Sequence, residues 1–105
     1  AVVPQEEGET YADALSGAAS RLLFPVIREV VSGVAEVSEC EIARAISFMH
    51  SRHHQVVEGA GSVGVAAVLA GKVDIAGRKT GIIISGGNIG DATLLKAVAE
   101  AGDMD

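Results

Sequence analysis

The stretch Thr80-Gly81-Ile82-Ile83-Ile84-Ser85-Gly86-Gly87-Asn88 predicts a short buried strand that ends in a polar, glycine-rich turn. Good helix formers follow over residues 92–100, so we expect a helix there. Strand, glycine turn and helix in this order place a ligand at the carboxyl end of a sheet strand. A strand exit that needs its two glycines only to turn explains the same pattern equally well.

The composition of the chain predicts an aliphatic core and limits the classes of partner. Its 105 residues make at most one domain, and 49% of them are apolar but only 3% aromatic, which is typical of helices packed on parallel strands. The net charge of -6 argues against nucleic acid as a partner, because phosphate binding needs clustered Lys and Arg. No apolar run is long enough to cross a bilayer and no signal peptide is visible, so we expect no membrane partner. A single cysteine fits a cytoplasmic location, and the missing initiator methionine suggests a piece of a longer protein.

The first half of the chain predicts two helices and one strand. Apolar residues at three-and-four spacing over 20–31 indicate a helix that begins near Pro25, and Val34–Val37 is a candidate strand. Ser38 with Glu41 three residues later predicts a capping box at the start of a second helix. The apolar stripe of that helix consists of Ile42, Ala45, Ile46 and Met49.

The second predicted helix carries histidines and one cysteine. His50, His53 and His54 lie at its end without a Cys or carboxylate at ligand spacing. Because a helix dipole favours cations there, we interpret them as a solvated cationic end and expect no metal. Cys40 lies in the first turn, where a thiolate can be stabilised, but no base is near it in sequence, so we interpret it as a passive thiol.

The glycines of the stretch 59–64 form a G-x-G-x-x-G pattern before an expected helix. Three observations argue against a dinucleotide site: the preceding strand is only residues 56–57, Glu58 would lie beside the pyrophosphate, and the position near Ser85 lacks the ribose-binding acid. We therefore expect a helix with small residues that packs closely on a neighbour. A carboxylate at this apolar helix start is either paired by backbone N–H groups or faces a site, and we expect Glu58 to face the same crevice as Ser85.

Four segments in order resemble the carboxyl-terminal part of threonine/serine dehydratases and serine racemases. Val57–Gly61 before an alanine-rich helix and Ile82–Asn88 are similar to two motifs of these pyridoxal-phosphate enzymes of the tryptophan-synthase-β type. Thr10–Asp13 is similar to the family's T-x-A-D-G, and Val37–Ile46 to its V-S-x-x-E-I-x-x-A-I. A dehydratase of hydroxyectoine degradation belongs to the same family, and the motifs do not separate it from the other members. The ordered set covers nearly the whole chain and is far more specific than any one motif.

The resemblance implies roles for individual residues. Ser85 would bond to the pyridine nitrogen of pyridoxal 5'-phosphate with Gly86 beside it, and Glu58 would lie near the 3-hydroxyl edge of the ring. Asp13 matches the aspartate beside the substrate. Ala14 departs from the family, which usually has a glycine there whose backbone approaches the cofactor, so its methyl group would shift the local backbone or the substrate fit.

The resemblance also implies that residues 1–105 are the carboxyl-terminal portion of the α/β, doubly wound large domain of a fold-type II pyridoxal-phosphate enzyme. The family's cofactor-binding lysine, asparagine loop, phosphate cradle and acidic metal site lie upstream, and no catalytic residue is expected in this segment. The expected function is a cytoplasmic, homo-oligomeric lyase that releases ammonia from threonine, serine or a similar hydroxy amino acid. The sheet should be completed by the remainder of the enzyme, on the same or another chain. A non-catalytic α/β binding or assembly module is the alternative, and an upstream lysine and glycine-rich loop would discriminate the two.

Overall fold

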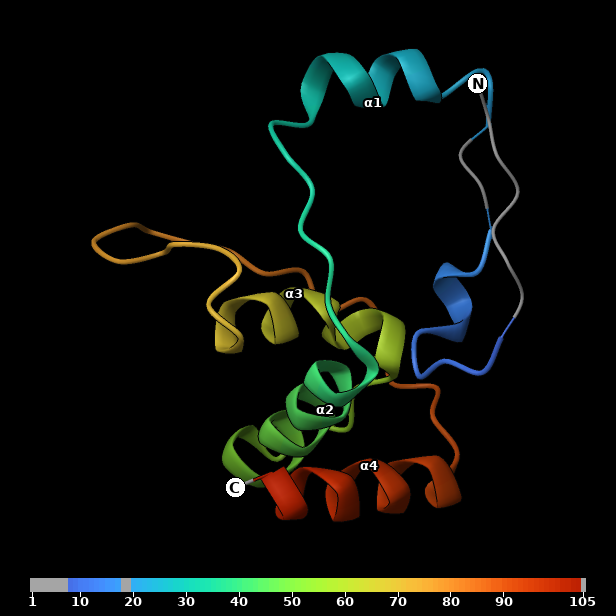
Figure 1. Ribbon diagram of the computed structural model, residues 1–105, viewed down its shortest axis with the longest axis vertical. Coiled ribbons are helices and arrows are strands. Elements are labelled where there is room, and N and C mark those ends of the chain that lie inside the picture. The colour runs from blue at the N-terminus through green and yellow to red at the C-terminus, as the bar shows by residue number, and fades with distance from the viewer. Residues whose placement is uncertain (1–7, 18–19, 105) are drawn as a thin grey trace.

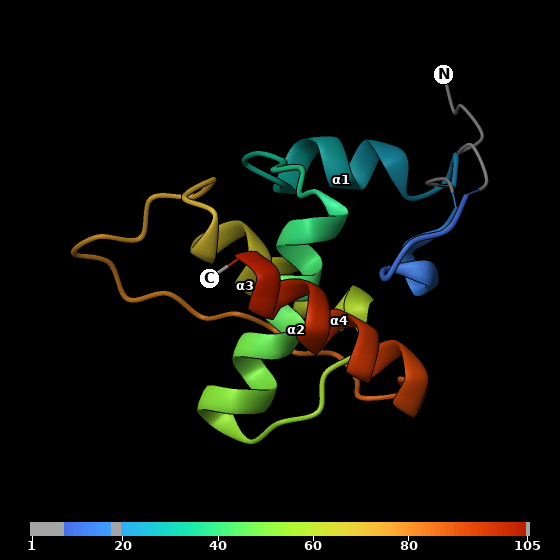
Figure 2. The same cartoon turned by 60° about the horizontal axis from the view of Figure 1, so that its bottom comes forward.

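Four helices and one short 3₁₀ helix make up the regular structure of the computed structural model, which describes residues 8–17 and 20–104 (Figure 1). The elements are η1 (Asp13–Leu15), α1 (Phe24–Val30), α2 (Glu39–His53), α3 (Gly59–Leu69) and α4 (Asp91–Met104). Helix α2 contacts both α3 and α4, and η1 contacts α3 (Figures 1 and 2). The last helix confirms the one predicted over residues 92–100 and extends it at both ends.

The predicted capping box starts α2, the helix at the centre of this core. The backbone N–H of Glu41 donates to Ser38 Oγ (3.2 Å), and the backbone N–H of Ser38 donates to Glu41 Oε2 (2.9 Å). The helix ends at His53 and is capped by His54, whose left-handed backbone (φ 55°) lets the N–H of Gln55 donate to the carbonyl of Met49 (3.0 Å). The apolar stripe predicted for this helix is confirmed, because its residues pack in the core. The buried core residues of α2 are Ile42, Ala43, Ala45 and Ile46, and they pack with Val65 and Ala66 of α3 and Ala97 of α4.

The two strands predicted at Val34–Val37 and Gly81–Ser85 are not formed, and no strand occurs within residues 8–17 and 20–104. A strand exists only as part of a hydrogen-bonded ladder, and neither segment has a neighbour in the described chain to pair with. Ile83, at the centre of the second segment, is 88% exposed. The predicted α/β class is therefore not confirmed, since the described elements are all helical.

Helix α1 begins as predicted, with Pro25 in its first turn, but its apolar face is not buried. It packs on none of the other described helices and lies apart from them (Figure 1). The exposed apolar residues of this region are Leu22, Leu23, Phe24, Val26, Ile27, Val30, Val31 and Val34. The chain exposes 7777 Å², whereas a compact chain of its mass exposes about 5,500 Å². The other described residues thus leave a large apolar surface around α1 uncovered.

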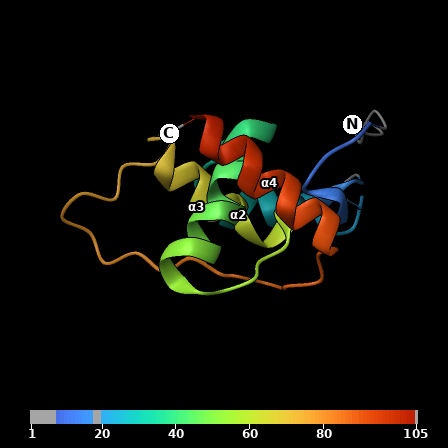
Figure 3. The same cartoon turned by 90° about the horizontal axis from the view of Figure 1, so that it is seen from below.

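Residues 71–90 form a long loop that leaves the end of α3 and runs back past that helix to α4 (Figure 3). Gly71 and Gly77 have positive φ values of 71° and 70°, which favour glycine at these turns. The returning part of the loop carries the predicted site residues Ser85 and Gly86. In the part of the chain that the structure describes, no helix is both long and apolar enough to span a bilayer.

Candidate functional site

Three segments that are far apart in sequence meet at the amino-terminal end of α3. Glu58 is the N-cap residue of this helix, and its backbone N–H donates to the carbonyl oxygen of Gly86 (3.1 Å). The backbone of Tyr11 and Ala12 lies against Gly59, the first residue of the helix. The structure thus brings together the segments around Ala12, Glu58 and Ser85 that the sequence singled out.

Glycines allow this close approach, which explains the G-x-G-x-x-G pattern by packing. A Cβ atom at Gly59 would overlap the carbonyl group of Tyr11. A Cβ atom at Gly61 would lie 3.1 Å from the carbonyl oxygen of Gly86, and one at Gly64 would lie 2.8 Å from Ile82 Cγ2. Each of the three glycines therefore faces another segment of this chain and leaves little room for a side chain.

The carboxylate of Glu58 lies over Gly86, where a Cβ atom would collide with Oε1. Glu58 is half-buried, and in the described residues its carboxylate has no hydrogen bond or ion pair. Ser85 precedes Gly86 and is exposed, and its hydroxyl group likewise has no partner in that part of the chain. A hydroxyl group and a carboxylate that have no partner among the described residues therefore flank a glycine that has no space for a side chain.

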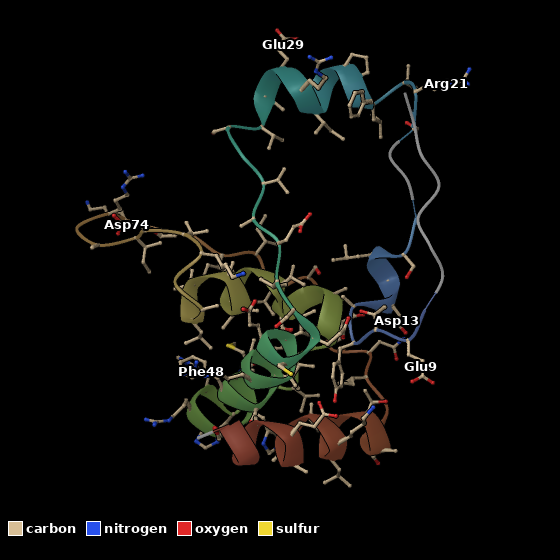
Figure 4. The ribbon with its side chains drawn as sticks, viewed as in Figure 1. Glu9, Asp13, Arg21, Glu29, Phe48 and Asp74 are labelled. Atoms are coloured by element: carbon tan, nitrogen blue, oxygen red, sulfur yellow. The ribbon has the colours of Figure 1, made fainter. Side chains whose placement is uncertain are left out.

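Asp13 and Ala14 are both exposed on η1, which packs on α3 (Figure 4). The short helix is closed by the N–H of Leu15, which donates to the carbonyl of Ala12 (2.9 Å), and by that of Ser16, which donates to the carbonyl of Asp13 (3.0 Å). Asp13 lines an open cleft of about 760 Å³. The residues that line this cleft do not include Ser85, Gly86 or Glu58. The cleft beside Asp13 is therefore not formed by these three residues.

Two glutamates that the sequence did not single out hold the segment before Asp13. The carboxylate of Glu39, in the first turn of α2, accepts from the hydroxyl group of Thr10 and from the backbone N–H of Tyr11 (2.9 Å). The hydroxyl group of Tyr11 donates to Glu100 Oε2 (2.7 Å) on α4. Burial and then the hydrogen bond to Glu100 raise the pKa of Tyr11 above its ordinary value, so this phenol stays protonated. Lys96 forms an ion pair with Glu100 (3.9 Å) and lies 5.6 Å from the centre of the Tyr11 ring.

No group of three or more potential metal ligands occurs in residues 8–17 and 20–104. His53 instead lies beside Phe48, with 5.2 Å between the ring centres. Cys40 is exposed and unpaired, and it lines the same cleft as Asp13.

Comparison with known proteins identifies relatives of this chain, although no family model matches it. Over 81 residues it is 44% identical to the L-threonine ammonia-lyase of Thermotoga maritima, and these residues make up 77% of this chain and 20% of that protein. Over 70 residues it is 46% identical to the catabolic L-threonine dehydratase of Escherichia coli K12, and these residues make up 65% of this chain and 21% of that protein. Over 66 residues it is 39% identical to an L-threo-3-hydroxyaspartate ammonia-lyase of Pseudomonas sp., and these residues make up 63% of this chain and 21% of that protein. The matches span about a fifth of the length of these curated relatives. By sequence, the chain is therefore homologous to a segment of the threonine ammonia-lyases and threonine dehydratases.

Proposed function

We propose that residues 1–105 are the carboxyl-terminal portion of the catalytic domain of a pyridoxal-phosphate-dependent ammonia-lyase that acts on threonine, serine or a similar hydroxy amino acid. The observation that carries the proposal is the 39–46% identity to proteins named as threonine and hydroxyaspartate ammonia-lyases or dehydratases. The meeting of three motif segments at the start of α3 supports it independently. In the net reaction, the amino acid loses its β-hydroxyl group as water and its nitrogen as ammonia, and addition of one water yields a 2-oxo acid.

The residues around Gly86 fit one edge of the pyridoxal-phosphate ring. A planar ring packs closely on backbone that carries no side chain, and Gly86 offers such backbone next to the Glu58 carboxylate. The ring nitrogen needs a polar partner, and the exposed hydroxyl group of Ser85 has none in the described part of the chain. The phosphate group is a poor fit close to the Glu58 carboxylate, so we assign it to the remainder of the enzyme.

Four residues of the chain have a defined task in the proposal. When bound, pyridoxal phosphate supplies an electron sink for the α-carbon of the substrate. Ser85 holds the ring nitrogen with a neutral hydroxyl group, which leaves that nitrogen largely unprotonated and suits loss of a β-hydroxyl group. Glu58 borders the 3-hydroxyl edge of the ring. Asp13 binds the polar groups of the substrate from η1, and the methyl group of Ala14 restricts the space beside it.

The exposed apolar surface around α1 supports a site that is completed by other polypeptide. Residues such as Leu22 and Val30, which are 83% and 69% exposed, are poor surface residues for an isolated chain. We propose that the remainder of the enzyme covers α1 and pairs with residues 81–85 in the sheet of a fold-type II enzyme. A homo-oligomer is the proposed assembly.

Release of ammonia by the complete polypeptide that contains this chain tests the proposed function. With L-threonine or L-serine and added pyridoxal phosphate, we expect equal amounts of ammonia and 2-oxo acid, and neither product after the cofactor is removed. If no substrate of this class releases ammonia and the cofactor does not bind, the proposal is wrong, and a non-catalytic binding module is the better interpretation.

A further inference from the structure

We propose that Glu39 is a positioning residue that fixes Asp13 for substrate binding. The inference rests on the proposed function, because it takes Asp13 as the residue beside the substrate. Glu39 contacts neither substrate nor cofactor in this account. It acts through the segment Thr10–Ala12, which leads directly into η1.

Both carboxylate oxygens of Glu39 are used to hold that segment. Oε1 accepts from the hydroxyl group of Thr10, and Oε2 accepts from the backbone N–H of Tyr11 (2.9 Å). The oxygen of Thr10 in turn accepts from the backbone N–H of Ala12 (3.1 Å). Three consecutive residues are thereby hydrogen-bonded to one carboxylate, directly or through the Thr10 hydroxyl group, immediately before Asp13 begins η1.

An acidic residue in the first turn of a helix is favourable for the helix itself, but that role needs no distant partner. In α2 the capping box is already complete through Ser38 and Glu41. Glu39 instead bonds to residues 28 and 29 positions earlier in the chain. Its two charge-assisted hydrogen bonds therefore fix the position of the Thr10–Ala12 segment relative to α2.

Two further contacts also fix this segment, so the hydrogen bonds to Glu39 are one of three anchors that hold it in place. The carbonyl group of Tyr11 packs against Gly59 at the start of α3, and the Tyr11 hydroxyl group donates to Glu100 on α4 (2.7 Å). Loss of the Glu39 anchor leaves the other two in place. We therefore expect Asp13 to shift while the helices stay packed and Ser85 stays where it is.

The test compares two ways of breaking the anchor with one way of keeping it. Glu39→Gln removes the charge, and Thr10→Val removes the hydroxyl group at nearly constant shape, whereas Thr10→Ser keeps the hydroxyl group. In the complete enzyme we expect Glu39→Gln and Thr10→Val each to raise KM for L-threonine about tenfold, with kcat changed less than about twofold. Thr10→Ser should keep the KM of the wild type. Glu29→Gln, on α1 and remote from the segment, is the matched charge control and should have no effect (Figure 4).

The same measurements separate the possible failures. Wild-type KM in both Glu39→Gln and Thr10→Val overturns the positioning role, and so does a Thr10→Ser variant as impaired as Thr10→Val. A lower kcat with unchanged KM and a lower melting temperature indicates a purely structural role and overturns the inference as well. An unchanged visible absorbance of bound cofactor in the variants supports a shift confined to Asp13. If the wild type itself releases no ammonia, the proposed function fails first, and the inference fails with it.

Discussion

Replacement of Ser85 by alanine is expected to lower the turnover of L-threonine on the order of a hundredfold, the usual effect of removing one hydrogen bond made to charge that develops during a reaction. In the proposed site the Ser85 hydroxyl group is the partner of the ring nitrogen, and alanine offers that nitrogen nothing. The fold should be unaffected, because Ser85 is exposed and its side chain has no partner in the described part of the chain. The measurement is 2-oxo acid formation at saturating substrate and cofactor, together with the melting temperature of each protein.

Ser32→Ala is the matched control for this experiment. Ser32 is also exposed, and it follows α1, far in sequence from Ser85. We expect the control to retain wild-type turnover. A Ser85→Ala enzyme with full activity would remove the assignment of the ring nitrogen to this residue.

Gly59→Ala is expected to have the largest effect on stability, with a loss of about 3 kcal/mol in the free energy of unfolding. The added methyl group would overlap the backbone carbonyl of Tyr11, and a backbone atom cannot move aside as a flexible side chain can. To relieve the overlap, η1 and α3 must separate. Since the Glu58–Gly86 contact lies at the same end of α3, the variant should also impair the proposed site.

Gly8→Ala supplies the comparison in urea-induced unfolding. A Cβ atom at Gly8 meets nothing within 4 Å, and the residue is exposed and lies outside the helices, so the substitution should change stability by less than about 0.5 kcal/mol. Equal unfolding midpoints for Gly59→Ala and Gly8→Ala would contradict the close packing of α3 on the Tyr11 segment.

Local signals predicted the starts of α1 and α2 well because each start depends on a few neighbouring residues. The capping box of Ser38 and Glu41, and Pro25 in the first turn of α1, act within a few residues of each other. The strand predicted at Gly81–Ser85 does not depend on neighbouring residues alone. Its isoleucines favour a buried strand, but a ladder needs a neighbouring strand that the described residues do not supply.

The candidate site was predicted only in part for a similar reason. The glycine spacing predicted a helix whose small residues pack closely on a neighbour, and Gly61 is found against the backbone of Gly86. Glu39 was not singled out, because its partner Thr10 lies 29 residues away and no local pattern links the two. The roles of Ser85, Asp13 and Ala14 toward cofactor and substrate stay predictions.

The central claim is that Ser85, Gly86 and Glu58 form one edge of a pyridoxal-phosphate site. A crystal structure of the complete polypeptide with bound pyridoxal phosphate tests it most directly. We predict that the ring nitrogen lies within hydrogen-bond distance of Ser85 Oγ, that Gly86 lies beside the ring, and that the Glu58 carboxylate borders its 3-hydroxyl edge. A cofactor bound elsewhere, or Ser85 packed under a helix away from any cleft, would contradict the account.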